Sequence, residues 1–441
     1  MKRPAYQKLV NWSRQKGRKP LILSGVRQVG KTYLLRQFGE NEFPQVHYFN
    51  FEKRPELASV FEPNLDPKRI INELSFHLNK PIHLNQDLVI FDEIQAIPKA
   101  ITSLKYFQED LSELAVACAG SLLGLELTPT SYPVGKTETI HLYPMTFLEF
   151  LQNMNEEQSV EFIKNCKKTT KIPPLIHQHL WEMLKRYFIV GGLPEVVTTF
   201  QQHSADLFTA FASVRDKQEQ LLMAYYADIA KHSGKVNAMH INRVWQAVPA
   251  QMASYQNSMA GKFKFRGVVP GVDRYSRLAG AIDWLITAGL VIKIPVVNYG
   301  QSPLFAYTKE GQFKLLLFDI GILGAMIHLS PQSILNYDYG AYKGYFAENY
   351  VAQELSASLE QPLFSWQENQ SEVEFLCEIA DQVIPIEVKS GWITRNKSLQ
   401  KFVNKYHPPY SVIMSANSLM IDDTQNVHCY PLYLAAHDFD K

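Results

Sequence analysis

A chain of 441 residues with 46% hydrophobic and 20% charged residues has the composition of a globular protein, which excludes the disordered and fibrous classes. Its length is about three times that of a typical domain, so we expect two or three cores. The formal net charge of +1 excludes a global attraction to nucleic acid or membranes, and any such partner would need a local patch.

Export and membrane insertion have no support in the sequence. Residues Met1 to Pro20 lack the apolar stretch of a secretory signal, and runs such as Leu84–Phe91 and Leu315–Ile327 fall short of the ~20 residues that span a bilayer. The four cysteines show neither close pairing nor zinc spacing, which fits a reducing compartment. We therefore predict a cytoplasmic protein without a membrane segment.

Four short apolar runs alternate with amphipathic stretches between Pro20 and Leu151, as in strands and helices around a parallel sheet. The runs are rich in β-branched and aromatic residues and are bounded by turn residues, as expected for buried strands. They are Leu21–Ser24, Val46–Phe51, Leu88–Phe91 and Ala115–Ala119. We predict an α/β core in residues 1–151.

A glycine-rich segment follows the first run and fits the pattern G-x-x-x-x-G-K-[ST] of a P-loop NTPase. Its glycines let backbone N–H groups curl around phosphates, and the N-terminus of the next helix adds partial positive charge. We predict that Lys31 bridges the β- and γ-phosphates of ATP and that Thr32 binds Mg²⁺. The predicted nucleotide-binding residues are Gly25, Val26, Arg27, Gln28, Val29, Gly30, Lys31, Thr32 and Tyr33.

Two carboxylates come directly after the third run, at the strand end where open α/β sheets bind ligands. We predict that Asp92 holds Mg²⁺ and that Glu93 orients or deprotonates the attacking water, so that the chain is an ATP hydrolase. The alternative, a solvated turn, suits an isolated acidic pair. After the fourth run, Ser121 either senses the γ-phosphate or caps a helix, and both interpretations stay open.

The middle of the chain is predicted to be a helical lid or linker, residues 152–235. Polar and lysine-rich residues from Gln152 to Pro173 predict a mobile junction. Apolar residues then recur at helical spacing from His177 to Lys231. The segment Gly191–Pro194 should interrupt these helices, because glycine and proline are costly inside a helix.

The next region, residues 236–338, is predicted to resemble a winged helix, with helices at Asn242–Met252 and Tyr275–Leu290 and a strand at Val291–Val297. Aromatic residues interleave with a basic cluster there, and such a patch can hold phosphates and stack bases of DNA. The cluster contains Lys262, Phe263, Lys264, Phe265, Arg266, Arg274, Tyr275 and Arg277. A solvated face beside a hinge is the alternative.

Residues 339–441 are predicted to be a second α/β domain, with a helix at Ala341–Leu359 and strands near Leu363–Trp366, Glu372–Leu376 and Gln382–Lys389. On the last of these strands Glu387 and Lys389 share one face. Glu374 points from the strand before it.

Carboxylates on two strands beside a lysine form the arrangement with which a restriction-endonuclease-like site binds Mg²⁺ and activates water. Glu348 on the preceding helix completes the predicted metal site of Glu348, Glu374, Glu387 and Lys389. An exposed strand face with alternating charges is the other interpretation.

Several motifs together resemble a widespread family of prokaryotic AAA-type ATPases that carry a C-terminal domain of unknown function. These are Gly25–Thr32, Phe91–Gln95 with Pro98, Ala119–Ser121, His141–Phe150, Gly191–Pro194, Lys343-Gly344 with Glu348-Asn349, and Ile386–Gly391. The resemblance implies a restriction-endonuclease-like C-terminal fold, although Glu374 stands where aspartate is usual. Lys136 replaces the family's common arginine and lacks its bidentate fork, so no trans-acting finger is expected there.

Three functions follow and remain open. The leading one is an ATP-driven switch in which the nucleotide changes the pose of the later domains. The second is an ATP-gated, metal-dependent nuclease in DNA defence or repair. The third treats the C-terminal region as a non-catalytic docking module for DNA or a protein partner.

Overall fold

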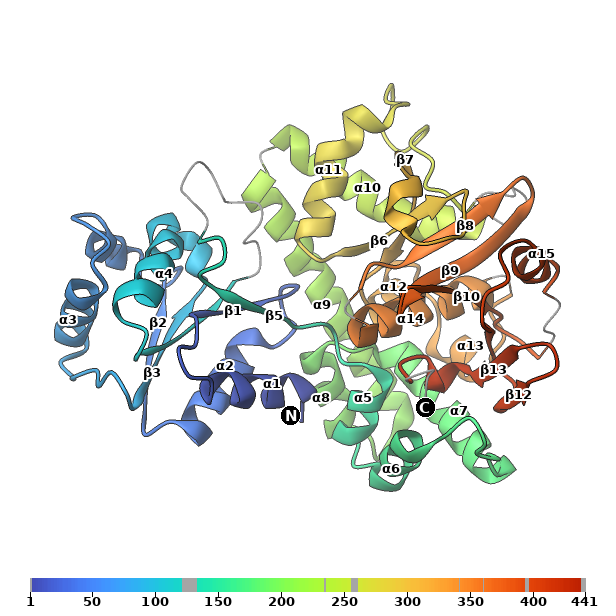
Figure 1. Cartoon of the computed structure of the whole chain (residues 1–441), viewed down its shortest axis with the longest axis horizontal. Coiled ribbons are helices and arrows are strands. Elements are labelled where there is room, and N and C mark those ends of the chain that lie inside the picture. Colours follow the sequence, from blue (N-terminus) through green and yellow to red (C-terminus); the bar gives the residue numbers. More distant parts are fainter. Residues whose placement is uncertain are drawn as a thin grey trace. The chain divides into compact units, whose positions relative to one another are not determined.

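The computed structural model describes residues 2–120, 133–233, 235–254, 261–340, 342–359, 361–392 and 396–437. The chain divides into two units (Figure 1), of which the first contains Met1–Tyr143 and Thr287–Gly289 and the second contains Pro144–Ile286 and Leu290–Lys441. The four-part division expected from the sequence, with boundaries after residues 151, 235 and 338, stays a prediction.

The first unit is built on a five-stranded parallel sheet with the strand order β2-β3-β4-β1-β5. The four predicted strands are all confirmed, and β5 is an additional one. Its elements are α1 (Pro4–Ser13), β1 (Leu21–Ser24), α2 (Lys31–Glu42), β2 (Gln45–Asn50), η1 (Pro55–Phe61), α3 (Pro67–Leu78), β3 (Asp87–Asp92), η2 (Ile94–Ala96), α4 (Pro98–Asp110), β4 (Ala115–Ala119) and β5 (Glu138–His141).

Strand alternation distributes the apolar side chains of this sheet between two faces. Phe49, Val89 and Phe91 belong to one buried cluster with residues of α3 and α4. Val46 and Leu88, which alternate with them, lie close to Gly39 of α2. Because both faces are covered, the strands read as near-continuous apolar runs, and this is why the sequence predicted them correctly.

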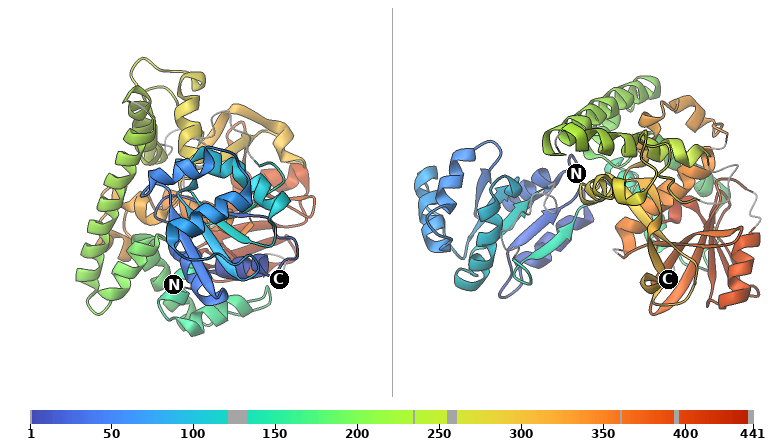
Figure 2. Two further views of the ribbon diagram at one scale, coloured as in Figure 1. Left: turned by 90° about the vertical axis from the view of Figure 1, so that its left-hand side faces the viewer. Right: turned by 90° about the horizontal axis from the view of Figure 1, so that it is seen from above.

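The second unit begins with helices. They are α5 (Phe147–Asn153), α6 (Glu157–Asn165), α7 (Pro174–Val190), α8 (Pro194–Gln202), α9 (Leu207–Ser233), α10 (Lys235–Ser254) and α11 (Tyr275–Thr287). The long helices α9 and α10 lie side by side (Figure 2). The prediction of a mobile junction from Gln152 to Pro173 is wrong, because α6 lies within that segment and buries Val160 and Ile163 against the fold.

The helices are interrupted at Gly191–Pro194, as predicted, and the structure gives a further reason for the glycines. A Cβ atom on Gly192 would lie 2.2 Å from the carbonyl oxygen of Met145. This close approach allows the Met145 N–H to donate to Gly192 O at 2.7 Å and the Gly192 N–H to donate to Asp319 at 2.6 Å. The break therefore anchors the first residues of the second unit.

A mixed sheet of eight strands, in the order β12-β13-β11-β10-β9-β8-β6-β7, forms the rest of the second unit. Its elements are β6 (Val291–Val297), η4 (Leu304–Tyr307), β7 (Thr308–Leu317), α12 (Ile320–Met326), α13 (Pro331–Leu335), α14 (Tyr342–Leu359), β8 (Phe364–Glu368), β9 (Ser371–Ile379), β10 (Gln382–Val388), α15 (Lys397–Tyr406), β11 (Ser411–Ser415), β12 (Met420–Asp422), β13 (Val427–Pro431) and η5 (Leu432–Leu434).

The predicted helix–helix–strand order of residues 236–338 agrees with α10, α11 and β6. However, β6 and β7 do not form a separate sheet. β6 pairs with β7 in antiparallel fashion and with β8 in parallel fashion, so the hairpin extends the sheet of the C-terminal region. The winged-helix assignment stays a prediction. Among the described residues, no helix combines the length and apolar character needed to cross a membrane.

Candidate functional site

The loop between β1 and α2 has the backbone geometry that its glycines permit. Gly25, Gln28 and Gly30 have φ angles of 146°, 68° and 95°, and Gly30 caps the N-terminus of α2. A Cβ atom on Gly25 would lie 2.2 Å from the Leu142 carbonyl oxygen, so a side chain is excluded there. The predicted phosphate-binding segment is thus a tight turn that opens a helix.

Lys31, the first residue of α2, is 7% exposed and lies inside this turn. Its Nζ donates to the carbonyl oxygens of Gly25 at 2.8 Å and Val26 at 3.0 Å. Burial lowers the pKa of Lys31 to about 8, and Glu93 and Asp92 only partly oppose this effect. A buried ammonium group that donates to carbonyl oxygens and is only partly compensated by nearby carboxylates favours an added anion.

Thr32 and Asp92 meet where α2 begins and β3 ends. The Thr32 hydroxyl lies 3.0 and 3.1 Å from the two carboxylate oxygens of Asp92. Tyr48 and Asn50 of β2 also donate to this carboxylate, at 2.5 and 3.1 Å. A hydroxyl and a fixed carboxylate are the oxygen donors that suit Mg²⁺ beside phosphates, so the residues present fit the predicted ion.

The other predicted nucleotide residues take different positions. Glu93 follows β3 with φ of 50°, and Gln95 donates to its carboxylate at 2.6 Å. Tyr33 is 56% exposed on α2. Ser121 lies outside the described residues. Lys136, which replaces an expected arginine, forms an ion pair with Glu109 at 3.0 Å.

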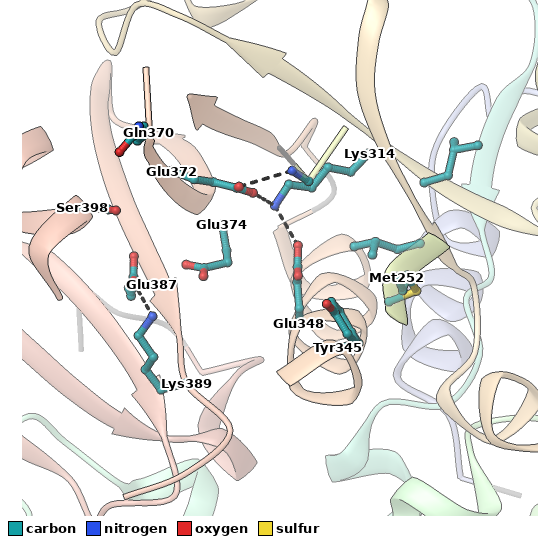
Figure 3. Close-up of a pocket in the computed structure, with 13 residues that line it drawn as sticks. Met252, Lys314, Tyr345, Glu348, Gln370, Glu372, Glu374, Glu387, Lys389 and Ser398 are labelled. Atoms are coloured by element: carbon teal, nitrogen blue, oxygen red, sulfur yellow. Dashed lines mark hydrogen bonds and ion pairs between the residues drawn. The ribbon is translucent and has the colours of Figure 1, made fainter. Parts of the chain in front are cut away.

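A second candidate site is a cavity of about 320 Å³ in the second unit, shown in Figure 3. It gathers the four residues predicted from the C-terminal sequence, namely Glu348 on α14, Glu374 on β9, Glu387 on β10 and Lys389 directly after it. Ile386 pairs with Phe375, so the next residues, Glu387 and Glu374, are opposite neighbours on antiparallel strands. Their role as metal ligands stays a prediction.

Two further charged residues line this cavity and were missing from the predicted site. Lys314 of β7 donates to Glu348 at 2.8 Å and forms an ion pair with Glu372 of β9. Lys389 bonds to Glu387 at 2.5 Å. A single lysine within the apolar run Phe313–Leu317 was the available signal, because a charge in a buried strand requires a countercharge.

The pKa shifts in the cavity reflect crowding of carboxylates. Burial, and then the charge of Glu387, raises the pKa of Glu374 to about 8. Burial also raises the pKa of Glu348, against the opposing effect of Lys314. Burial alone would lower the pKa of Lys314 and Lys389, but the surrounding carboxylates raise both above the ordinary value.

The described residues of the cavity do not form a complete set of metal ligands. Within the described part of the chain, no three or more histidine, cysteine, aspartate or glutamate side chains are grouped so that they could hold a metal ion. One oxygen of Glu387, Oε2, is nevertheless buried without a hydrogen-bond partner. The two lysines therefore neutralise part of the cluster and leave one carboxylate oxygen available.

The basic cluster near α11 differs in part from the expectation. Lys264, Arg266, Arg274 and Arg277 are exposed, as a phosphate-binding patch requires. Phe263, however, is buried and stacks on Phe313 of β7, so its proposed availability to nucleic-acid bases is wrong. Phe265 and Tyr275 contact the same Phe313 ring. DNA binding by the cluster stays a prediction.

Comparison with protein families assigns three segments. Residues 17–151 match the profile of an AAA domain. Residues 182–333 and 343–434 match the profiles of two domains of unknown function, DUF8612 and DUF4143. No curated protein matches the chain.

Solved structures resemble the chain only distantly. The Walker-type ATPase paby2304 of Pyrococcus abyssi is 15% identical, with a TM-score of 0.45, over 73% of this chain and 94% of that one. The RuvB Holliday junction branch migration motor of Thermotoga maritima is 13% identical (TM-score 0.33; 67% and 90% covered), and Drosophila ORC bound to DNA is 13% identical (TM-score 0.28; 74% and 95% covered).

The AAA profile and the geometry of the β1–α2 loop agree with each other. The first unit therefore contains an AAA-type domain with the parallel sheet and the glycine-bounded turn of a P-loop fold. The later segments carry no assigned activity.

Proposed function

We propose that the chain is a Mg²⁺-dependent ATPase that works as a nucleotide-driven switch. The observation that carries the proposal is the direct contact of Thr32 with Asp92 beside a folded P-loop. It joins the two motifs, 60 residues apart, at the carboxyl ends of parallel strands.

Each residue of the proposed ATP site has a separate role. Lys31 exchanges its bonds to Gly25 and Val26 for the β- and γ-phosphates, where an anion offsets the cost of its burial. Thr32 and Asp92 would hold Mg²⁺, which would neutralise charge on the transferred phosphoryl group. Glu93, oriented by Gln95, accepts the proton of the attacking water.

A path from this domain into the second unit supports the switch. The first unit ends at Tyr143 after β5, and Pro144 begins the second. Four residues after Tyr143, the backbone N–H of Phe147 donates to the buried carboxyl group of Glu354 on α14, at 2.9 Å. The hydroxyl of Tyr187 on α7 donates to the carbonyl oxygen of Met145.

Helix α14 then connects this anchor to the acidic cavity. Gln353 bonds to Tyr187 and to the backbone N–H of Ile320, and Asn349 bonds to both backbone groups of Leu317. Glu348 lies one residue before Asn349 and lines the cavity. A shift of the segment 144–147 would therefore act on the helix that carries Glu348.

The ATPase is tested by nucleotide titration and steady-state hydrolysis. We expect the wild type to bind MgATP and hydrolyse it, and Lys31→Ala to lose nucleotide binding. Hydrogen exchange of the segment 144–150, measured with and without ATP, tests the switch. Equal ATPase rates in the two proteins would refute the catalytic assignment, and ATP-independent exchange would refute the coupling.

A second candidate function is metal-dependent cleavage of nucleic acid at the cavity. The buried, unpartnered oxygen of Glu387 beside Glu374 favours it, because a carboxylate in this state lacks a positive partner on one side. Lys389 stands next to both carboxylates, as a restriction-endonuclease-like site requires. Metal-dependent nicking of plasmid DNA, absent in Glu387→Ala, is the expected result.

A docking role for the C-terminal region predicts a different result with DNA. DNA retention without nicking, weakening steeply as salt increases, would favour a docking module over the nuclease. Retention by the exposed basic cluster should then fall in Arg274→Ala and Arg277→Ala.

A further inference from the structure

The charged groups of the acidic cavity separate into two halves (Figure 3). In one half, Lys314 is bonded to Glu348 and Glu372. In the other half, Glu374 and Glu387 face each other across β9 and β10, with Lys389 bonded to Glu387. The halves differ in how completely their carboxylates are satisfied.

Lys314 occupies the position of a bridging cation in the first half. It is 6% exposed and joins carboxylates from two elements, α14 and β9. The backbone N–H of Gly261 also approaches Glu372, at 3.4 Å, on the same side. A lysine ammonium is a compact point charge with several donors, so it can hold two carboxylates together much as a metal ion does.

The second half has unused acceptors. Oε2 of Glu387, a residue that is only 3% exposed, has no hydrogen-bond partner among the residues that the structure describes. Glu374 accepts from the backbone N–H of Val388 at 3.2 Å. One or two carboxylates together with water are sufficient ligands for Mg²⁺ or a similar cation.

The charges of the cavity fit one such cation. Its four glutamates outnumber its two lysines, so carboxylate oxygens are left for one added cation. A second divalent ion would have to displace Lys314 from Glu348 and Glu372.

We propose that Lys314 is a built-in substitute for a second metal ion, so that the cavity binds a single divalent cation at Glu374 and Glu387. Glu348 then serves as a partner of Lys314 and not as a metal ligand. The inference rests on the second candidate function only in requiring that Glu374 and Glu387 bind a cation.

Mn²⁺ titration of the full-length protein without nucleotide, followed by electron paramagnetic resonance, tests this assignment. The relevant ion is the one lost in Glu387→Gln, which should weaken binding by at least about 10-fold. We expect one such ion per wild-type chain and a much smaller loss of affinity in Glu348→Gln than in Glu387→Gln. Lys314→Met should bind a second Mn²⁺, and the double variant Lys314→Met/Glu348→Gln should lose it again.

The possible results distinguish a failure of the inference about Lys314 from a failure of the metal site itself. A Glu348→Gln variant that binds Mn²⁺ as weakly as Glu387→Gln would make Glu348 a ligand and overturn the role of Lys314 while leaving the metal site intact. A wild type that binds two ions would do the same. No Mn²⁺ sensitive to Glu387 in any variant would overturn both the metal site and the inference.

Should Lys314→Met fail to fold, as circular dichroism would reveal, the comparison of Glu348→Gln with Glu387→Gln decides by itself. Both substitutions keep the size of the side chain and its ability to form hydrogen bonds. Lys314→Arg, which keeps the cation, should bind one Mn²⁺ like the wild type.

Discussion

Lys31 of the P-loop and Lys314 of the acidic cavity are almost equally buried, at 7% and 5% exposed, yet their surroundings differ. Lys31 is bonded to two backbone carbonyl oxygens, and burial lowers its pKa. Lys314 is paired with two carboxylates, which overcome the effect of burial and raise its pKa. Among the described residues no carboxylate is bonded to Lys31, whereas the cavity has more carboxylates than lysines, so the two sites should take ligands of opposite charge.

The two sites also differ in how the chain assembles them. The phosphate-binding turn is one continuous stretch, Gly25–Thr32, whose backbone supplies the N–H groups. The cavity draws its charged groups from β7, α14, β9 and the end of β10. A site built from the backbone of consecutive residues can be found from a motif, whereas a site built from distant side chains depends on the register of strands and helices.

The largest effect is expected at Glu93. Glu93→Gln removes the proposed base and should lower ATP turnover by roughly 10²–10⁴-fold while MgATP binding persists. Glu56→Gln, at an exposed position of the same unit, is the matched control and should hydrolyse ATP at the wild-type rate. Turnover is measured by phosphate release, and binding by calorimetry. Wild-type turnover in Glu93→Gln would show that Glu93 is not the catalytic base.

Lys314→Met tests the cavity side of the comparison. Removing one partner of a buried ion pair leaves Glu348 and Glu372 without their cation and should lower the free energy of unfolding by about 3–5 kcal/mol. Urea denaturation measures the loss.

Lys217→Met provides the control, because Lys217 forms a 2.8 Å ion pair with Glu195 at a more exposed position, where about 0–1 kcal/mol is expected. Similar losses in both variants would mean that burial of Lys314 has no special role.

The pH dependence of stability should report on Glu354, on the helix that carries Glu348. Burial raises the pKa of Glu354 from 4.5 to about 8; the Phe147 N–H opposes this and the charge of Glu149 adds to it. The folded protein therefore holds this proton more tightly than the unfolded chain. This contribution is complete below pH 4.5 and is lost as the pH rises through about 8, with a slope of up to about 1.4 kcal/mol per pH unit.

Glu354→Gln cannot release a proton and should flatten this slope. The measurement is the urea midpoint of both proteins from about pH 4 to about pH 9, a range that brackets the proposed transition of about 4.5 to 8. Parallel curves for wild type and variant would assign the pH dependence to other groups.

The smallest effect is expected for Lys31→Met without nucleotide. No carboxylate in the described part of the chain is bonded to Lys31, so removing its charge relieves a burial cost as well as losing two hydrogen bonds, and stability should change by less than about 1.5 kcal/mol. Thermal unfolding of Lys31→Met and Lys314→Met side by side is the direct comparison. A loss at Lys31 as large as that at Lys314 would show that equal burial, and not the neighbours, sets the cost.

The sequence predicted the first unit more completely than the second. Strands β1 to β4 were found because both faces of a parallel sheet are buried. Strand β5 was missed, since only Ile140 among its residues is buried. Helix α6 was missed because its polar residues outnumber its three apolar ones, of which Val160 and Ile163 are buried.

In the cavity, Glu374, Glu387 and Lys389 were predictable because strand alternation fixes which residues share a face. Lys314 was not, since nothing local shows that β7 joins the same sheet as β9 and β10. Phe263 was misjudged for the same reason, because only the fold brings it against Phe313.

By itself, the sequence determined the P-loop turn, the helix that follows it and the acidic end of β3, because glycine conformations and strand alternation act over a few residues. The tertiary structure alone decided that Asp92 meets Thr32 and that Lys314 lies among the carboxylates of α14 and β9. Such contacts depend on pairing between strands that are far apart in the sequence, 60 residues in the case of Thr32 and Asp92, and a buried charge takes its properties from the partners that this pairing supplies.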